Sequence, residues 1–172
     1  MPARLSYFFG SMPMDGDPKP TARDRSGVLF PPPLAFLAGL GAGWLLDQIV
    51  SARIPPSFRL QIGAPLFLAG CTLALLAELA LIAGKTPANP YRASRSIIDT
   101  GPYRFSRNPM YVAFSLIFAG IAFSSGSIST LTMLPVVLLA IRYGVIAREE
   151  AYLERKFGSE YLAYKKRVRR WL

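Results

Sequence analysis

Apolar residues are gathered into four long blocks, and the polar residues lie between the blocks rather than among them. The blocks cover about residues 28–50, 60–84, 110–123 and 128–146. A helix that rises about 1.5 Å per residue needs about 20 apolar residues to cross a bilayer core of about 30 Å. This segregation predicts an all-α, polytopic integral membrane protein with about four transmembrane helices. The third block is short, so we expect that helix to be tilted or shielded by its neighbours.

Short stretches rich in proline, glycine and serine mark where these helices begin and turn. The prolines at 31–33 favour a helix start. Residues 124–127, Ser-Ser-Gly-Ser, predict a tight hairpin within the membrane between the last two helices. Residues 148–172 are charged with an aromatic side, which is typical of a cytoplasmic helix at the membrane surface. No strand precedes Gly39 and Gly43, so we expect helix packing there rather than a nucleotide-binding glycine loop.

Positive charge sets the expected topology. The chain carries 20 Lys and Arg against 10 Asp and Glu, a formal net charge of +10. Most cations lie in the first 27 residues, in the loop after the second block and beyond residue 147, whereas the opposite side holds only Arg53 and Arg59. Cytoplasmic segments carry such an excess. We therefore expect both termini in the cytoplasm, a bacterial inner membrane as the location, and no nucleic-acid partner, because membrane topology already accounts for the charge.

The same pattern divides the chain into three regions. We expect residues 1–27 to form a flexible cytoplasmic tail, residues 28–84 to form two transmembrane helices, and residues 85–172 to carry the chemistry. The chain has no histidine and a single cysteine, Cys71. No metal site is expected, because these are the usual zinc ligands, and the commonest general base is missing. The bilayer is the expected partner, and the oligomeric state stays open.

Two polar segments contain residues suited to a charged cofactor. Residues 99–111 read Asp-Thr-Gly-Pro-Tyr-Arg-Phe-Ser-Arg-Asn-Pro-Met-Tyr, and such a rigid stretch also suits an interfacial anchor. In the second segment Arg142 and Glu149 are seven apart, which predicts one shared helix face, and Glu150 follows. Arginine can hold a carboxylate, a carboxylate can hold an ammonium or a diol, and tyrosine can face a sulfonium. Structural ion pairing is the alternative for Arg142, and Glu78 suits a functional or an interfacial role equally.

Residues 85–172 resemble the isoprenylcysteine carboxyl methyltransferase family and the related membrane phospholipid methyltransferases. The matching pieces, in matching order, are Asp-Thr-Gly-Pro-Tyr-Arg at 99–104, Ser-Arg-Asn-Pro-Met-Tyr at 106–111, Glu-Glu at 149–150, and Phe-Gly-x-Glu-Tyr-x-x-Tyr-x-x-Arg at 157–167. Their combination is far more specific than any single piece, and it covers about half of the chain. The two N-terminal helices match in hydropathy only.

The resemblance implies an all-helical membrane enzyme without a Rossmann domain. Its S-adenosylmethionine cofactor would sit between the last membrane helices and the C-terminal helix. The resemblance gives cofactor-binding roles to the residues that match the motifs, namely Tyr103, Arg107, Asn108, Pro109, Tyr111, Glu149 and Glu150. Family members also place an arginine near the reacting carboxylate, so Arg142 and Glu149 are the expected catalytic residues. Histidine often stands where this chain has Asn108; a hydrogen-bonding role survives that change, and a general-base role does not.

These features favour an S-adenosylmethionine-dependent methyltransferase that acts on a lipid or lipid-modified carboxylate at the cytoplasmic face. A carboxylate is already a nucleophile, whereas an amine must first lose a proton, so the absence of histidine leans toward an oxygen nucleophile. Three alternatives stay open. They are an N-methyltransferase acting on a phospholipid or amine, a sterol-reductase-like enzyme that uses NADPH, and a membrane scaffold whose basic end binds anionic lipid.

Overall fold

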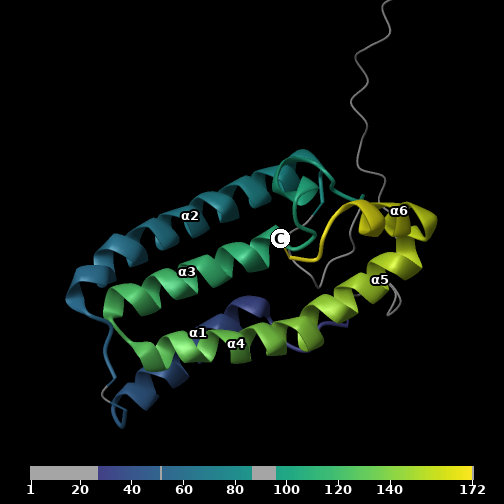
Figure 1. Cartoon of the computed structure of the whole chain (residues 1–172). Helices are drawn as coiled ribbons and strands as arrows, with labels where there is room; N and C mark the ends of the chain where they lie inside the picture. Colours follow the sequence, from purple (N-terminus) through teal and green to yellow (C-terminus); the bar gives the residue numbers. More distant parts are fainter. Residues whose placement is uncertain (1–26, 51, 87–95, 172) are drawn as a thin grey trace, which may run out of the picture.

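The protein is built from helices that follow the apolar blocks closely. The computed structural model describes residues 27–50, 52–86 and 96–171, so the expected N-terminal tail lies outside the described residues apart from Gly27. The four apolar helices are α1 (Pro32–Asp47), α2 (Pro56–Ala83), α3 (Pro109–Ser125) and α4 (Ile128–Ile141) (Figure 1). The described residues contain two isolated β-bridges and no strand. The prediction of an all-helical fold is confirmed.

Prolines and one glycine fix the helix ends. A proline occupies the first turn of α1, α2 and α3, where an amide would have no acceptor within the helix. The chain turns between α3 and α4 at Gly126, whose φ of +71° is left-handed and costs glycine little. Ser127 then caps α4, because its hydroxyl accepts a hydrogen bond from the Thr130 amide at 2.8 Å. The predicted helical hairpin is therefore present.

The surface of the helices is suited to lipid. In the described chain, two helices have the length and hydropathy of a membrane span: α2 and the continuous helix Ile128–Phe157. Helix α3 is apolar but shorter. On α2, Leu60, Leu68 and Leu75 are each more than half exposed, and a helix in water would not leave such a continuous apolar face uncovered. The structure is thus that of a helical membrane protein, and four spans remain a prediction.

The helices pack as two antiparallel pairs, α2 along α3 and α1 along α4, joined by the α3–α4 hairpin (Figure 1). Glycines allow this close packing. A Cβ atom at Gly120 would lie 2.6 Å from the backbone nitrogen of Phe67 on α2. Gly43 on α1 lies directly against the backbone of Thr130 on α4. The predicted packing role of the glycines in the first apolar block is confirmed.

The C-terminal part of the chain departs from the single helix expected over residues 148–172. Helix α4 continues through one π-helical turn, η3 (Arg142–Ile146), into α5 (Ala147–Phe157). A new helix, α6 (Ser159–Arg167), follows after Gly158, whose φ of +53° requires glycine and breaks the helix. The chain end then returns to the start of α3, near the short helix η2 (Gly101–Arg104) (Figure 1). There the Arg107 amide donates to the Arg169 carbonyl at 2.9 Å.

Candidate functional site

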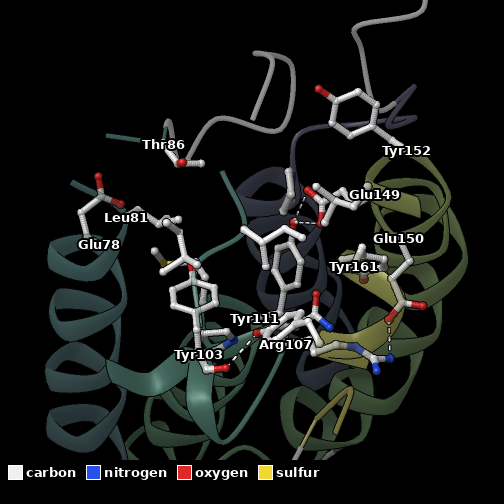
Figure 2. A pocket seen from close by; sticks show the side chains of 18 of the residues that line it. Glu78, Leu81, Thr86, Tyr103, Arg107, Tyr111, Glu149, Glu150, Tyr152 and Tyr161 are labelled. Atoms are coloured by element: carbon white, nitrogen blue, oxygen red, sulfur yellow. Dashed lines mark hydrogen bonds and ion pairs between the residues drawn. The ribbon is translucent and has the colours of Figure 1, made fainter. Parts of the chain in front are cut away.

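A cavity of about 670 Å³ lies where α2 ends and α3 begins. Its walls come from the start of α1, the end of α2, the segment before α3, and helices α5 and α6. Its volume falls within the range of roughly 300–1,000 Å³ that is usual for small-molecule sites. Figure 2 shows Tyr103, Tyr111, Glu149 and Tyr161 around this space. The fold therefore collects polar side chains from distant parts of the sequence into one pocket.

An ion-pair network forms one wall of the cavity. Glu150 is buried, and its carboxylate accepts hydrogen bonds from Arg107 Nη2 at 2.8 Å and from Arg170 Nη2 at 2.7 Å. The Arg107 side chain is 8 % exposed, and its Nη1 also donates to the carbonyls of Lys165 and Val168, at 2.9 and 3.0 Å. Buried charges are tolerated when they are paired and hydrogen-bonded. Glu150 and the two arginines therefore stabilise one another.

The same region ties the start of α3 to the chain end. Buried Asn108 donates from its Nδ2 to the Arg170 carbonyl at 2.9 Å, and buried Pro109 is the first residue of α3. Hydrogen bonding to Glu150 raises the pKa of the Arg170 guanidinium, which keeps that partner charged. Asn108 thus acts as a hydrogen-bond donor, the role that the sequence allows at this position.

Glu149 presents a carboxylate to the cavity from the first turn of α5. The buried hydroxyl-bearing side chain of Tyr111 donates to both of its oxygens, at 2.9 and 3.1 Å. In the described part of the chain, no cation forms a salt bridge with Glu149. A positively charged ligand group would therefore find an oriented carboxylate here that forms no salt bridge within the described residues.

Three tyrosines around the cavity remain neutral phenols. Burial raises the pKa of Tyr103, Tyr161 and Tyr164 above the ordinary value of 10.0. The charges of Glu149 and Glu78 raise the pKa of Tyr103 further. The Tyr164 hydroxyl donates to the Tyr103 carbonyl at 2.8 Å, which joins α6 to η2. These side chains offer rings and hydrogen-bond donors, not anions.

Glu78 lines the cavity from α2, where it is partly buried. No ion pair or hydrogen bond joins it to another described residue. Figure 2 shows Glu78 on the side of the cavity opposite to Glu149. The sequence left a functional and an interfacial role equally open for Glu78, and the fold places it in the cavity wall.

The structure brings together all seven residues that were expected to bind the cofactor: Tyr103, Arg107, Asn108, Pro109, Tyr111, Glu149 and Glu150 line the cavity. Arg142 does not line it. Its side chain is exposed, and its guanidinium lies 5.6 Å from the centroid of the Tyr143 ring. The π-helical turn that begins at Arg142 changes the helical register. A spacing of seven therefore does not carry Arg142 to the face from which Glu149 reaches the cavity.

Several cavity residues were missed or misread in the sequence. The aromatic side of residues 148–172 was expected at the membrane interface, but Tyr161 and Tyr164 are only 2 % and 4 % exposed and line the cavity. The reason is the break at Gly158, which turns α6 back toward η2. Arg170 carried no distinguishing signal, because it is one of several cations near the chain end.

Comparison with known proteins identifies the family of the chain. The model of a phospholipid methyltransferase family matches residues 58–160. A 37-residue stretch is 60 % identical to an uncharacterized protein of Haemophilus influenzae, and it covers 22 % of this chain and 59 % of that protein. The chain thus matches less than two thirds of that relative's length. No solved structure matches the chain. Because the family match spans more than half of the 172 residues, the chain belongs to the phospholipid methyltransferase family of membrane methyltransferases, which includes the isoprenylcysteine carboxyl methyltransferase-like enzymes.

Proposed function

We propose that this protein transfers a methyl group from S-adenosylmethionine to a lipid acceptor at the cytoplasmic face of a bacterial inner membrane, in which it is a multi-pass protein. The convergence of Arg107, Tyr111 and Glu149 on one cavity of about 670 Å³ carries the proposal. These residues come from the two segments that resemble the methyltransferase motifs. The cavity lies at the end of the bundle where the positive charge is concentrated, and the cofactor is a cytoplasmic metabolite.

The cavity residues fit the functional groups of that cofactor. It carries a sulfonium, an ammonium, a carboxylate, a ribose diol and an adenine ring. Glu149, oriented by Tyr111, would hold the ammonium or the diol. Arg107 Nε is buried and has no acceptor within the described residues. An unpaired buried donor costs about 1–3 kcal/mol, and the cofactor carboxylate would satisfy it. When bound, the cofactor supplies a methyl group on positively charged sulfur.

The other expected site residues support this arrangement. Glu150 would position Arg107 by accepting a hydrogen bond from its Nη2. Asn108 would position the start of α3 by donating to the Arg170 carbonyl. Pro109 fixes the first turn of α3, and Tyr103 contributes a neutral phenol. This proposal gives Arg142 no role, because its side chain does not line the cavity.

The chain would contribute positioning and the exclusion of water. Holding an acceptor in line with the methyl group can supply about 7–11 kcal/mol of the barrier, and a drier site weakens competition from water. Apolar side chains continue the cavity wall beside the polar groups: Leu81, Met110, Phe114 and Leu153. These would hold the lipid tail of the acceptor while its headgroup reaches the polar end.

Binding of S-adenosylhomocysteine to the detergent-purified protein, measured by calorimetry, tests the proposal. We expect wild type to bind, and both Glu149→Gln and Tyr111→Phe to lose about tenfold or more in affinity, because each removes part of the charge-assisted contact. Glu160→Gln is the matched control, since Glu160 is exposed on α6. Thermal unfolding checks that every variant is folded. Failure of folded wild type to bind would overturn the proposal and make NADPH the next ligand to test.

A further inference from the structure

The charges around the cavity do not balance. Among its described lining residues, three are acidic, Glu78, Glu149 and Glu150, and one is basic, Arg107. Arg107 is already bonded to Glu150 at 2.8 Å. Arg170, the second cation on Glu150, does not line the cavity. Within the described residues, the two carboxylates of Glu78 and Glu149 therefore face the cavity without a cation paired to them.

These two carboxylates lie on different walls. Glu149 projects from α5 and is held by Tyr111, whereas Glu78 projects from α2 on the other side of the cavity (Figure 2). If Glu149 serves the cofactor, as proposed above, Glu78 is the charged group left to face the acceptor. Apolar Leu81 lies one turn further along the same helix and also lines the cavity. A headgroup beside Glu78 would thus have an apolar surface next to it for its tail.

An acid on a membrane helix is costly unless it is solvated or paired. A carboxylate headgroup placed beside Glu78 would add like-charge repulsion in a site that is partly shielded from water. An ammonium headgroup would instead supply the missing partner through a charge-assisted hydrogen bond. The charges in the cavity therefore disfavour a carboxylate acceptor, although the absence of histidine from the sequence favoured one.

We propose that Glu78 is a specificity-determining residue that binds the protonated amine headgroup of the lipid acceptor and selects it over a carboxylate. This inference rests on the proposed function. Before transfer the ammonium loses one proton to water. The nitrogen lone pair then forms the N–C bond while the C–S bond breaks and leaves its electron pair on sulfur. Because a neutral amine takes a methyl group from a sulfonium, the positive charge passes from sulfur to nitrogen, and the methylated product is itself an ammonium that Glu78 stabilises.

The experiment uses the full chain in detergent with two acceptors, phosphatidylethanolamine and a prenylated cysteine that carries a free carboxylate. Transfer of labelled methyl groups gives kcat and KM for each acceptor, and calorimetry gives the affinity for S-adenosylhomocysteine. We expect wild type to methylate the amine. In Glu78→Gln, KM for the amine should rise about tenfold or more, the effect of losing one charge-assisted hydrogen bond, while S-adenosylhomocysteine binds as in wild type. Glu78→Asp should recover part of the loss, and Glu160→Gln should match wild type.

A folded Glu78→Gln variant with wild-type KM for phosphatidylethanolamine would overturn the inference. A wild-type protein that methylates the prenylated cysteine and not the amine would also overturn it. This second test needs no variant, so it decides the inference even if Glu78→Gln does not fold. In both cases retained binding of S-adenosylhomocysteine leaves the proposed function intact. Loss of that binding in wild type would instead remove the proposed function, and the role of Glu78 with it.

Discussion

At the scale of single residues, two adjacent glutamates have different surroundings. Glu150 is buried between Arg107 and Arg170 and holds the chain end against the start of α3. Glu149 faces the cavity and is bonded to Tyr111. The family resemblance predicted that both bind the cofactor, because a sequence motif gives the positions of residues but not the contacts of their side chains. The contacts support direct binding for Glu149 and a positioning role for Glu150, since a carboxylate shared by two arginines has little capacity left for a ligand.

Tyr164 gives a prediction about pH at this scale. Burial raises the pKa of Tyr164 above 10.0, so the unfolded chain releases the phenol proton before the folded protein does. Its contribution to stability is complete below about pH 10 and is lost as pH rises toward the folded pKa. We expect the melting temperature of wild type to fall as pH rises from about 10 to about 12, and that of Tyr164→Phe to fall less steeply.

Thermal unfolding in detergent across that pH range measures both slopes. Tyr143→Phe is the control, because Tyr143 is 65 % exposed and should leave the wild-type slope unchanged. Identical slopes for wild type and Tyr164→Phe would contradict the expectation. Below pH 9 the Phe variant should be less stable by about 1 kcal/mol, because it lacks the hydrogen bond to the Tyr103 carbonyl.

At the scale of helices, close packing of α2 and α3 depends on glycine at Gly120. An added Cβ would lie 2.6 Å from the Phe67 backbone nitrogen, and backbone cannot move aside as a flexible side chain can. We expect Gly120→Ala to lower the free energy of unfolding by about 1–3 kcal/mol. Gly41→Ala is the matched control, since nothing lies within 4 Å of the added methyl group.

The control should be neutral or more stable by up to about 1 kcal/mol, because alanine favours a helix. Thermal unfolding of the two purified variants measures the difference. Equal melting temperatures for the two alanine variants would show that α2 and α3 do not pack this closely.

The π-helical turn shows what helical periodicity misses. Spacing in sequence placed Arg142 and Glu149 on one face, because an ideal α-helix repeats about every 3.6 residues. The turn Arg142–Ile146 interrupts that repeat, so Arg142 ends on an exposed surface and Glu149 in the cavity wall. Such insertions have no reliable signal in a single sequence, because they depend on packing around the helix.

At the scale of the whole molecule, the cavity lies at one end of the helix bundle, and the α1–α2 and α3–α4 connections lie at the other end. The cavity gathers the end of α2 and the starts of α1, α3 and α5, whereas the Gly126 turn of the hairpin lies at the other end (Figure 1). This arrangement predicts that α6 lies in the cytoplasm and that the α1–α2 connection lies across the membrane.

Cysteine labelling in a Cys71→Ser background tests that topology. Ile49, after α1, is 81 % exposed, and Glu160 on α6 is exposed. In intact bacterial cells a membrane-impermeant maleimide should label Ile49→Cys and spare Glu160→Cys, and it should label both after the cells are opened. Labelling of Glu160→Cys in intact cells would reverse the proposed orientation.

The sequence by itself determined the membrane class, the four apolar helices, the hairpin and the motif residues around the cavity. These follow from local rules: apolar length, proline at helix starts and glycine at turns leave their mark in consecutive residues. The seven residues that the family resemblance predicted line one cavity. Their motif segments lie at the starts of α3 and α5, and these two helix ends meet at the same end of the bundle.

Only the tertiary structure decided which charges meet. It paired Glu150 with Arg170, turned Tyr161 and Tyr164 inward, moved Arg142 away from the cavity and brought Glu78 into its wall. Each of these outcomes depends on helix register, on the break at Gly158, or on contacts between residues far apart in the chain. Such contacts arise from packing in three dimensions, and no local pattern in this sequence records them.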